Sequence, residues 1–298
     1  MDILKIEGLK KSFGTKEVLR GLSFSVPEHT VYGFVGRNGA GKSTTMKIAL
    51  GILAADSGDV YVDGDKVRYG DASTNRCVGY LPDVPEFYDY MTAREYLKFC
   101  GELSKMEAAE IKSRSEELLS LVGLAGEKKR VKGFSRGMKQ RLGVAQALLH
   151  RPKLLICDEP TSALDPLGRR ELLDILEAVK GETTVLFSTH ILSDVEQICD
   201  RVALLEKGSI ALEGTIDEIK SSHGQGDVTI VAGSDEECKK LIGRFGKLVR
   251  GEHNSLKLKE SEQLPDVLRY IADEGITLMR LERGEVTLED LFMEVISE

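Results

Sequence analysis

The chain has 298 residues, of which 41% are hydrophobic and 30% are charged, and this is the composition of an ordinary globular protein. Its net charge of −8 gives no electrostatic support to a nucleic-acid partner, and its apolar runs are far too short to span a membrane. The N-terminus lacks the layout of a signal peptide and the five cysteines lack C-x-x-C spacing, so we expect reduced thiols in a cytosolic protein.

The first two thirds of the chain alternate strand-like and helix-like segments. Residues 22–26 alternate with a period of two, which predicts a half-buried antiparallel strand. Compact apolar runs, which predict strands covered on both faces, occur at residues 31–35, 154–158, 183–188 and 202–206. We therefore predict a layered α/β domain over residues 1–220.

Two further segments interrupt or follow this alternation. Residues from about 92 to 150 are mostly helical and more charged, and we interpret them as an α-helical subdomain inserted into the α/β domain. Residues 221–226 are rich in Ser and Gly and predict a linker. The segment 227–298 has the order strand, helix, strand, strand, helix, strand and a final helix, so we predict a small α+β domain with a ferredoxin-like motif.

A glycine-rich loop after residues 31–35 carries the first chemical signal, because it fits the pattern G-x-x-x-x-G-K-[ST] between a strand and a helix. Its glycines let backbone N–H groups face phosphates, Lys42 reaches the β- and γ-phosphates, and the Ser43 hydroxyl faces Mg²⁺. The loop therefore predicts binding of a nucleoside triphosphate with Mg²⁺. The predicted phosphate-binding residues are Gly36, Arg37, Asn38, Gly39, Ala40, Gly41, Lys42, Ser43 and Thr44.

Two acidic residues end the apolar run at 154–158. Asp158 suits a metal site opposite Ser43, because a Mg²⁺–triphosphate site needs a carboxylate. Glu159 lies at the exit of the strand, where hydrolysis needs a group that orients or deprotonates water. A strand end with solvated acids is the alternative, and the phosphate loop favours the metal and base roles.

Several motifs together resemble those of ABC-type ATPases. Residues 158–165 (Asp-Glu-Pro-Thr-Ser-Ala-Leu-Asp) and 188–190 (Ser-Thr-His) are similar to the Walker B motif, the D-loop and the switch histidine. Residues 134–141 (Phe-Ser-Arg-Gly-Met-Lys-Gln-Arg) resemble the signature motif. Phe13 lies where the family places an aromatic residue upstream of the phosphate loop. The resemblance spans residues 2 to about 220 and implies an ATPase with the ABC type of P-loop NTPase fold.

The resemblance also implies a role for each matching residue. Phe13 would stack on the adenine of ATP, Glu159 would be the general base, and His190 would contact the γ-phosphate. Ser135 and Gly137 would complete the ATP site of a second copy of the chain. This implies a head-to-tail homodimer that holds two ATP molecules between its protomers. Ser135 is also a good N-cap for the helix that follows it, and the two roles are compatible.

The sequence departs from the family pattern at the signature motif and at the Q-loop. Phe134, Arg136 and Met138 stand where Leu, Gly and Gln are usual. Asp83 stands at the Q-loop position that is usually Gln. A carboxylate can still serve Mg²⁺, directly or through water, so we predict that Asp83 belongs to the metal site.

The resemblance implies a membrane partner. The modified signature, together with a C-terminal region that ends in Thr-Leu-Glu-Asp-Leu-Phe at residues 287–292, is similar to export subunits for drugs, antibiotics, lipids or ions. Such a subunit would power a separate integral membrane permease from the inner face of the cell membrane. The alternative is a soluble ABC-type ATPase that acts in assembly or regulation. The aromatic residues Phe87, Tyr88 and Tyr90 suit either docking of a partner helix or packing on the helical subdomain.

Overall fold

The computed structural model describes residues 1–222, 228–251, 254–258, 263–284 and 287–297. The chain divides into two compact units, Met1–Ile216 and Asp217–Glu298, whereas the sequence places the boundary after residue 220. Residues 221 and 222 of the predicted linker belong to helix α7 (Ile216–Ser222), whose first turn carries two acidic residues that favour a helix N-terminus. Residues 223–226 of that predicted linker lie outside the described residues.

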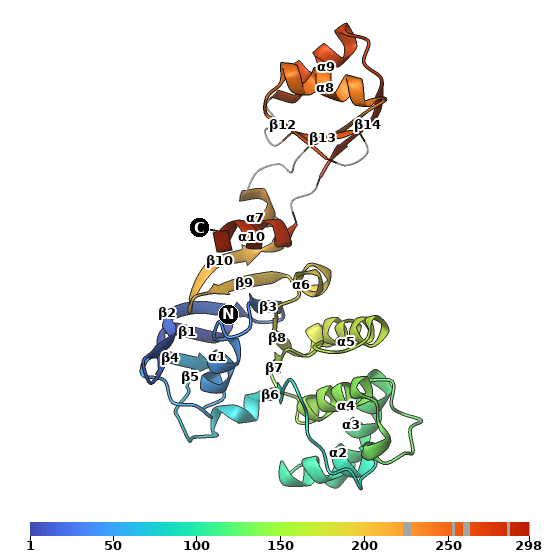
Figure 1. The fold of residues 1–298 in the computed structure, drawn as a ribbon. Coiled ribbons are helices and arrows are strands. Elements are labelled where there is room, and N and C mark those ends of the chain that lie inside the picture. The colour runs from blue at the N-terminus through green and yellow to red at the C-terminus, as the bar shows by residue number, and fades with distance from the viewer. Residues whose placement is uncertain (223–227, 252–253, 259–262, 285–286, 298) are drawn as a thin grey trace. The chain divides into compact units, whose positions relative to one another are not determined.

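A six-stranded sheet forms the centre of the first unit (Figure 1). Its order is β10-β9-β3-β8-β7-β6, and all neighbours are parallel except β9 and β10. Its strands are β3 (Val31–Gly36), β6 (Val78–Leu81), β7 (Leu154–Asp158), β8 (Thr184–Thr189), β9 (Arg201–Glu206) and β10 (Ser209–Thr215). Every residue of β3, β7 and β8 is buried, which confirms the prediction of strands covered on both faces.

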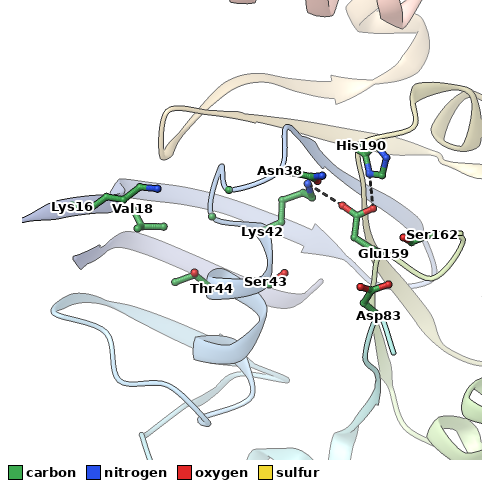
Figure 2. Close-up of a pocket in the computed structure, with 12 residues that line it drawn as sticks. Lys16, Val18, Asn38, Lys42, Ser43, Thr44, Asp83, Glu159, Ser162 and His190 are labelled. Atoms are coloured by element: carbon green, nitrogen blue, oxygen red, sulfur yellow. Dashed lines mark hydrogen bonds and ion pairs between the residues drawn. The ribbon is translucent and has the colours of Figure 1, made fainter. Parts of the chain in front are cut away.

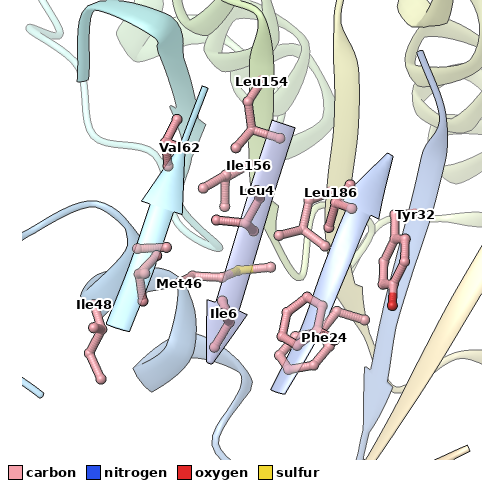
Figure 3. Close-up of a cluster of buried hydrophobic side chains, with 14 of the residues drawn as sticks. Leu4, Ile6, Phe24, Tyr32, Met46, Ile48, Val62, Leu154, Ile156 and Leu186 are labelled. Atoms are coloured by element: carbon pink, nitrogen blue, oxygen red, sulfur yellow. The ribbon is translucent and has the colours of Figure 1, made fainter. Parts of the chain in front are cut away.

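A second, antiparallel sheet has the order β2-β1-β4-β5. Its strands are β1 (Asp2–Phe13), β2 (Lys16–Pro27), β4 (Ser57–Val62) and β5 (Asp65–Lys66). Leu22, Phe24 and Val26 of β2 are buried and alternate with more exposed residues, as predicted for a half-buried strand. Figure 3 shows side chains of this sheet, of β3, β7 and β8, and of helix α1 (Lys42–Ala49) in one buried cluster. This core fixes α1 against both sheets.

Three helices are inserted between β6 and β7, as predicted for the helical subdomain: α2 (Ala93–Leu103), α3 (Ala108–Leu121) and α4 (Arg136–Leu148). Thr92 begins α2 with a capping box to Glu95, and the Ser135 hydroxyl begins α4 by accepting the Met138 N–H at 3.2 Å. Helices α5 (Pro166–Ala178) and α6 (Leu192–Ile198) follow β7 and β8, and short 3₁₀ turns lie at Thr74–Cys77, Val131–Gly133 and Val179–Gly181. None of the described helices has the length and apolar content to cross a membrane.

Two of the three aromatic residues before α2 pack on that helix. The ring centroids of Phe87 and Tyr96 are 5.0 Å apart, and those of Tyr88 and Phe99 are 5.5 Å apart, both in edge-to-face geometry. The ring centroids of Tyr90 and Tyr88 are 5.9 Å apart. Of the two roles expected for these residues, packing on the helical subdomain is therefore present for Phe87 and Tyr88.

The second unit has its own antiparallel sheet with the order β12-β13-β11-β14. Its elements, besides α7, are β11 (Val228–Ala232), α8 (Asp235–Arg244), β12 (Leu248–Arg250), β13 (Ser255–Leu258), α9 (Leu264–Asp273), β14 (Leu278–Arg283) and α10 (Leu288–Ser297). The first strand of the sheet lies between the third and the fourth, and helices connect β11 to β12 and β13 to β14, which confirms the ferredoxin-like motif. A separate cluster of buried side chains, which includes Ile230, Leu256 and Val267, forms its core.

Because each unit has its own core, the first unit is expected to fold without the second. A chain that ends at Ile216 keeps the buried cluster of Figure 3 and every predicted phosphate, metal and base residue. We predict that this fragment unfolds cooperatively, measured by circular dichroism, and binds ATP in a direct titration. A folded fragment that does not bind ATP would show that residues 217–298 contribute to the site.

Candidate active site

The loop from β3 to α1 has a backbone that requires glycine at several positions. Gly39 and Gly41 have φ angles of 83° and 118°, which side-chain-bearing residues rarely adopt. A Cβ atom at Gly36 would lie 2.6 Å from the carbonyl oxygen of Leu205 in the neighbouring strand. Within the described part of the chain no side chain caps α1, so the N–H groups at its N-terminus are available to an anion.

Lys42, the first residue of α1, directs its ammonium group back over this loop. Lys42 Nζ donates hydrogen bonds to the carbonyl oxygens of Gly36 at 2.5 Å and Arg37 at 3.3 Å. It also forms an ion pair of 3.0 Å with Glu159 Oε1, and only 5% of the Lys42 side chain is exposed. The loop thus holds a nearly buried cation where the predicted phosphates bind.

A pocket beside this loop brings most of the predicted site residues together (Figure 2). Its lining consists of Lys16, Val18, Asn38, Gly39, Gly41, Lys42, Ser43, Thr44, Asp83, Glu159, Ser162 and His190. These residues come from the ends of β2, β6, β7 and β8 and from the loop before α1, with the start of that helix. Segments far apart in the sequence therefore form one polar site.

Glu159 is held at both its backbone and its side chain. Its φ of 49° lies in the left-handed region, which is uncommon for a non-glycine residue and is found at functional sites. Glu159 Oε1 faces Lys42, and Oε2 lies 2.8 Å from His190 Nδ1. The dashed lines in Figure 2 mark these two interactions. The carboxylate is therefore oriented in the pocket by a cation and an imidazole.

Asp83 lies beyond the end of β6 and is contacted by α4. Gln140 Nε2 donates a hydrogen bond of 2.5 Å to the backbone oxygen of Asp83, and Arg136 Nη2 lies 3.7 Å from its carboxylate. Burial raises the pKa of the Asp83 carboxyl above its ordinary value, Arg136 opposes this rise, and the negative charges of Asp158 and Glu159 add to it. The acidic side of the pocket therefore favours a cation.

The oxygen donors of the site fit Mg²⁺ bound together with a nucleotide. Ser43 and Asp83 line the pocket, and Asp158 is the residue immediately before Glu159. Among the described residues no cluster of three or more His, Cys, Asp or Glu side chains could hold a metal ion by itself. Mg²⁺ usually binds through one or two carboxylates with water and substrate phosphates, so this donor set suits a metal that arrives with ATP.

Seven predicted residues do not contribute side chains or backbone to the pocket lining: Phe13, Gly36, Arg37, Ala40, Ser135, Gly137 and Asp158. Gly36 and Arg37 act on the site through their carbonyl oxygens, which bind Lys42. Asp158 is 6% exposed and its Oδ1 accepts a hydrogen bond of 2.7 Å from the Ser188 hydroxyl. Phe13 lies at the end of β1, half exposed, and pairs with Lys16 across the hairpin.

Ser135 and Gly137 lie at the N-terminus of α4. Ser135 is exposed there, and its hydroxyl caps the helix, as the N-cap interpretation predicts. Neither residue lines the pocket of its own chain. The role of these residues in a second copy of the chain stays a prediction.

Three lining residues were missed by the sequence analysis. Lys16 and Val18 belong to β2 and reach the pocket because the β1–β2 hairpin folds back over the glycine-rich loop, where Val18 contacts the Gly41 position. This contact depends on how β1 and β2 pair, which no local sequence motif reveals. Ser162 lies in the turn after Glu159, where its N–H donates to the Glu159 carbonyl oxygen at 3.0 Å. Its place in the D-loop-like motif is a signal that could have identified it.

Comparison with known proteins gives matches over both units. The model of the ABC transporter family matches residues 19–162, and that of the C-terminal domain of ATP-binding proteins like DrrA1-3 matches residues 214–296. Among solved structures, an ATP-binding subunit of an ABC transporter is 32% identical, with a TM-score of 0.67, over 74% of this chain and 93% of its own. The CbiO1 structure from Clostridium perfringens is 26% identical, with a TM-score of 0.69, and the match covers 82% of this chain and 96% of its own.

Curated relatives match over nearly the full length. The uncharacterized ABC transporter ATP-binding protein YxlF of Bacillus subtilis is 39% identical, and the match covers 99% of each chain. The bacitracin transport ATP-binding protein BcrA of Bacillus licheniformis is 33% identical over 99% of this chain and 97% of its own. The linearmycin resistance ATP-binding protein LnrL of Bacillus subtilis is 33% identical over 98% and 97%. The chain therefore belongs to the family of ABC transporter ATP-binding proteins, and its nucleotide-binding unit is an ATPase domain of that family.

Proposed function

We propose that this chain is the ATP-hydrolysing subunit of an exporter and that it works as a head-to-tail dimer attached to a separate membrane permease. The observation that carries the proposal is the exposed signature segment at the start of α4. Ser135 is exposed and Gly137 is half-buried there, and neither residue lines the pocket of its own chain. A capped helix N-terminus binds anions, so this segment suits the phosphates of ATP held by another protomer.

Within one protomer, residues of the pocket and residues beside it divide the work of hydrolysis. Lys42 and the N–H groups of the glycine-rich loop hold the phosphates, and Phe13 stacks on the adenine once ATP is bound. Glu159 accepts a proton from the attacking water, and His190 orients Glu159 and contacts the γ-phosphate. Ser43, Asp158 and Asp83 would hold Mg²⁺, which would supply positive charge against the phosphates.

The export direction rests on the relatives and on the second unit. Two relatives of nearly full length carry names that refer to bacitracin transport and linearmycin resistance. The second unit matches the C-terminal domain of DrrA1-3-like ATP-binding proteins, and its core is separate from the nucleotide pocket. Such a unit is free to serve dimer contacts or coupling to the permease, and attachment to that permease would place the chain at the inner face of the membrane.

Co-purification tests the partner. Where a multi-span membrane protein is encoded next to this chain, the two proteins are co-expressed with an affinity tag on the membrane protein alone. We predict that the chain co-purifies with this protein in detergent and that its ATPase rate changes in the complex. A chain that stays in the soluble fraction as an active ATPase, without binding the membrane protein, would favour the alternative of a soluble ABC-type ATPase in assembly or regulation.

Glu159→Gln tests the general base. The amide cannot accept a proton, so the hydrolysis rate should fall by a factor of ~10²–10⁴. ATP affinity should stay the same or increase, because Lys42 loses the anion that competes with the phosphates for it. A stable ATP-bound dimer should then appear in gel filtration. Lys42→Ala is the contrasting variant, since it should weaken ATP binding itself. Turnover of Glu159→Gln at the parental rate would exclude Glu159 as the base.

Asp83→Ala tests the metal role of the Q-loop residue. Removing this carboxylate should raise the Mg²⁺ concentration needed for half-maximal hydrolysis more than it changes ATP affinity. Asp89→Ala is the matched control, because Asp89 is an exposed acid in the same segment that pairs with Lys139 at 3.6 Å and does not line the pocket. Equal Mg²⁺ dependence in both variants would leave Asp83 as a loop or partner contact.

A further inference from the structure

Ser188 is a buried polar residue that the roles above do not use. It lies in β8 between β3 and β7, with Phe34 as its partner on one side and Asp158 on the other. Its side chain is 0% exposed. A hydroxyl in such a place needs hydrogen-bond partners, and the partners it has are the two acidic positions of the site.

The Ser188 hydroxyl makes two hydrogen bonds whose directions are fixed by chemistry. The backbone N–H of Glu159 can only donate, and it donates to Ser188 Oγ at 3.0 Å. The hydroxyl proton is then directed to Asp158, and Ser188 Oγ donates to Asp158 Oδ1 at 2.7 Å. This bond restrains the orientation of the Asp158 carboxylate. Its other oxygen, Oδ2, stays available to a cation.

The same strand end therefore holds Glu159 at two points. The Ser188 hydroxyl accepts a hydrogen bond from the backbone N–H of Glu159, a residue that has the left-handed conformation with φ of 49°. His190, two residues further along the chain, lies 2.8 Å from its carboxylate. An unusual backbone conformation persists only where surrounding contacts determine it. Ser188 supplies such a contact and, through the same oxygen, fixes the neighbouring Asp158.

We propose that Ser188 is a positioning residue of the ATPase site, which ties the metal-binding carboxylate of Asp158 to the backbone of the general base Glu159. This inference rests on the roles proposed above for those two acids. Residues that orient metal ligands typically change metal affinity or activity by about 10–100-fold when they are removed. A serine with a purely structural role would instead change only the stability of the fold.

Ser188→Ala separates these two roles. We expect kcat to fall by about 10–100-fold. The Mg²⁺ concentration that supports half-maximal ATP binding, measured by titration without turnover, should rise by about tenfold. ATP binding in the presence of EDTA should stay at the parental level, because the loop and Lys42 are untouched. That last measurement also shows that the variant is folded.

Thr184→Val is the matched control on the same strand. Thr184 is 2% exposed, lies at the opposite end of β8, and accepts a hydrogen bond from the His29 N–H at 2.9 Å. The variant thus loses a buried hydrogen bond outside the site. It should lower the melting temperature and leave the Mg²⁺ dependence of ATP binding at the parental value. If Ser188→Ala gave this same pattern, Ser188 would be structural and the inference would be overturned.

Glu159→Gln in the same assays distinguishes failure of this inference from failure of the proposed base. If Glu159→Gln is inactive while Ser188→Ala keeps the parental kcat and Mg²⁺ dependence, only the role of Ser188 is excluded. If Glu159→Gln is active, the base assignment fails. The Mg²⁺ dependence of ATP binding in Ser188→Ala then still decides whether Ser188 positions Asp158.

Discussion

Parallel pairing of β3, β8 and β7 is the constraint on which the site depends. Carboxyl ends of parallel strands meet at one edge of a sheet, and in α/β folds ligands bind outside that edge. Here the register pairs Val35 with Thr189 and Ser188 with Asp158, so the glycine-rich loop, His190 and the two acids all emerge side by side. Because all three strands are buried on both faces, a slip of register by one residue would exchange the side chains that pack against the two faces.

The ammonium group of Lys42 is compensated by groups of the chain itself. Lys42 has a nearly buried ammonium group, and two carbonyl oxygens and one carboxylate surround it. A buried charge without partners is costly, so these contacts explain how the fold tolerates a nearly buried cation at this position. Binding of a triphosphate then exchanges one anionic partner of Lys42 for another.

Much of the site could be predicted from the sequence because its motifs are local. Lys42 and Ser43 could be placed because the glycine-rich loop lies between a strand and a helix. Glu159 could be placed because it is one of two acids at the end of a buried strand. Contacts that depend on pairing between distant segments were not predictable. Val18 reaches the loop only because of the register of the β1–β2 hairpin. Ser188 belongs to a local sequence motif, but the motif does not show that Ser188 pairs with Asp158 of the neighbouring strand. Composition alone also did not reveal that helix α7 continues through residues 221 and 222 of the predicted linker.

The separate core of the ferredoxin-like unit has a consequence for any measurement of stability. Two clusters of buried side chains, one in each unit, mean that the whole chain is not expected to unfold in a single two-state step. ATP binds the folded first unit and stabilises it by mass action, so its melting transition should shift with nucleotide concentration. A calorimetric trace of the chain would accordingly separate into a part that responds to nucleotide and a part that reports the second unit, and one melting temperature would describe neither.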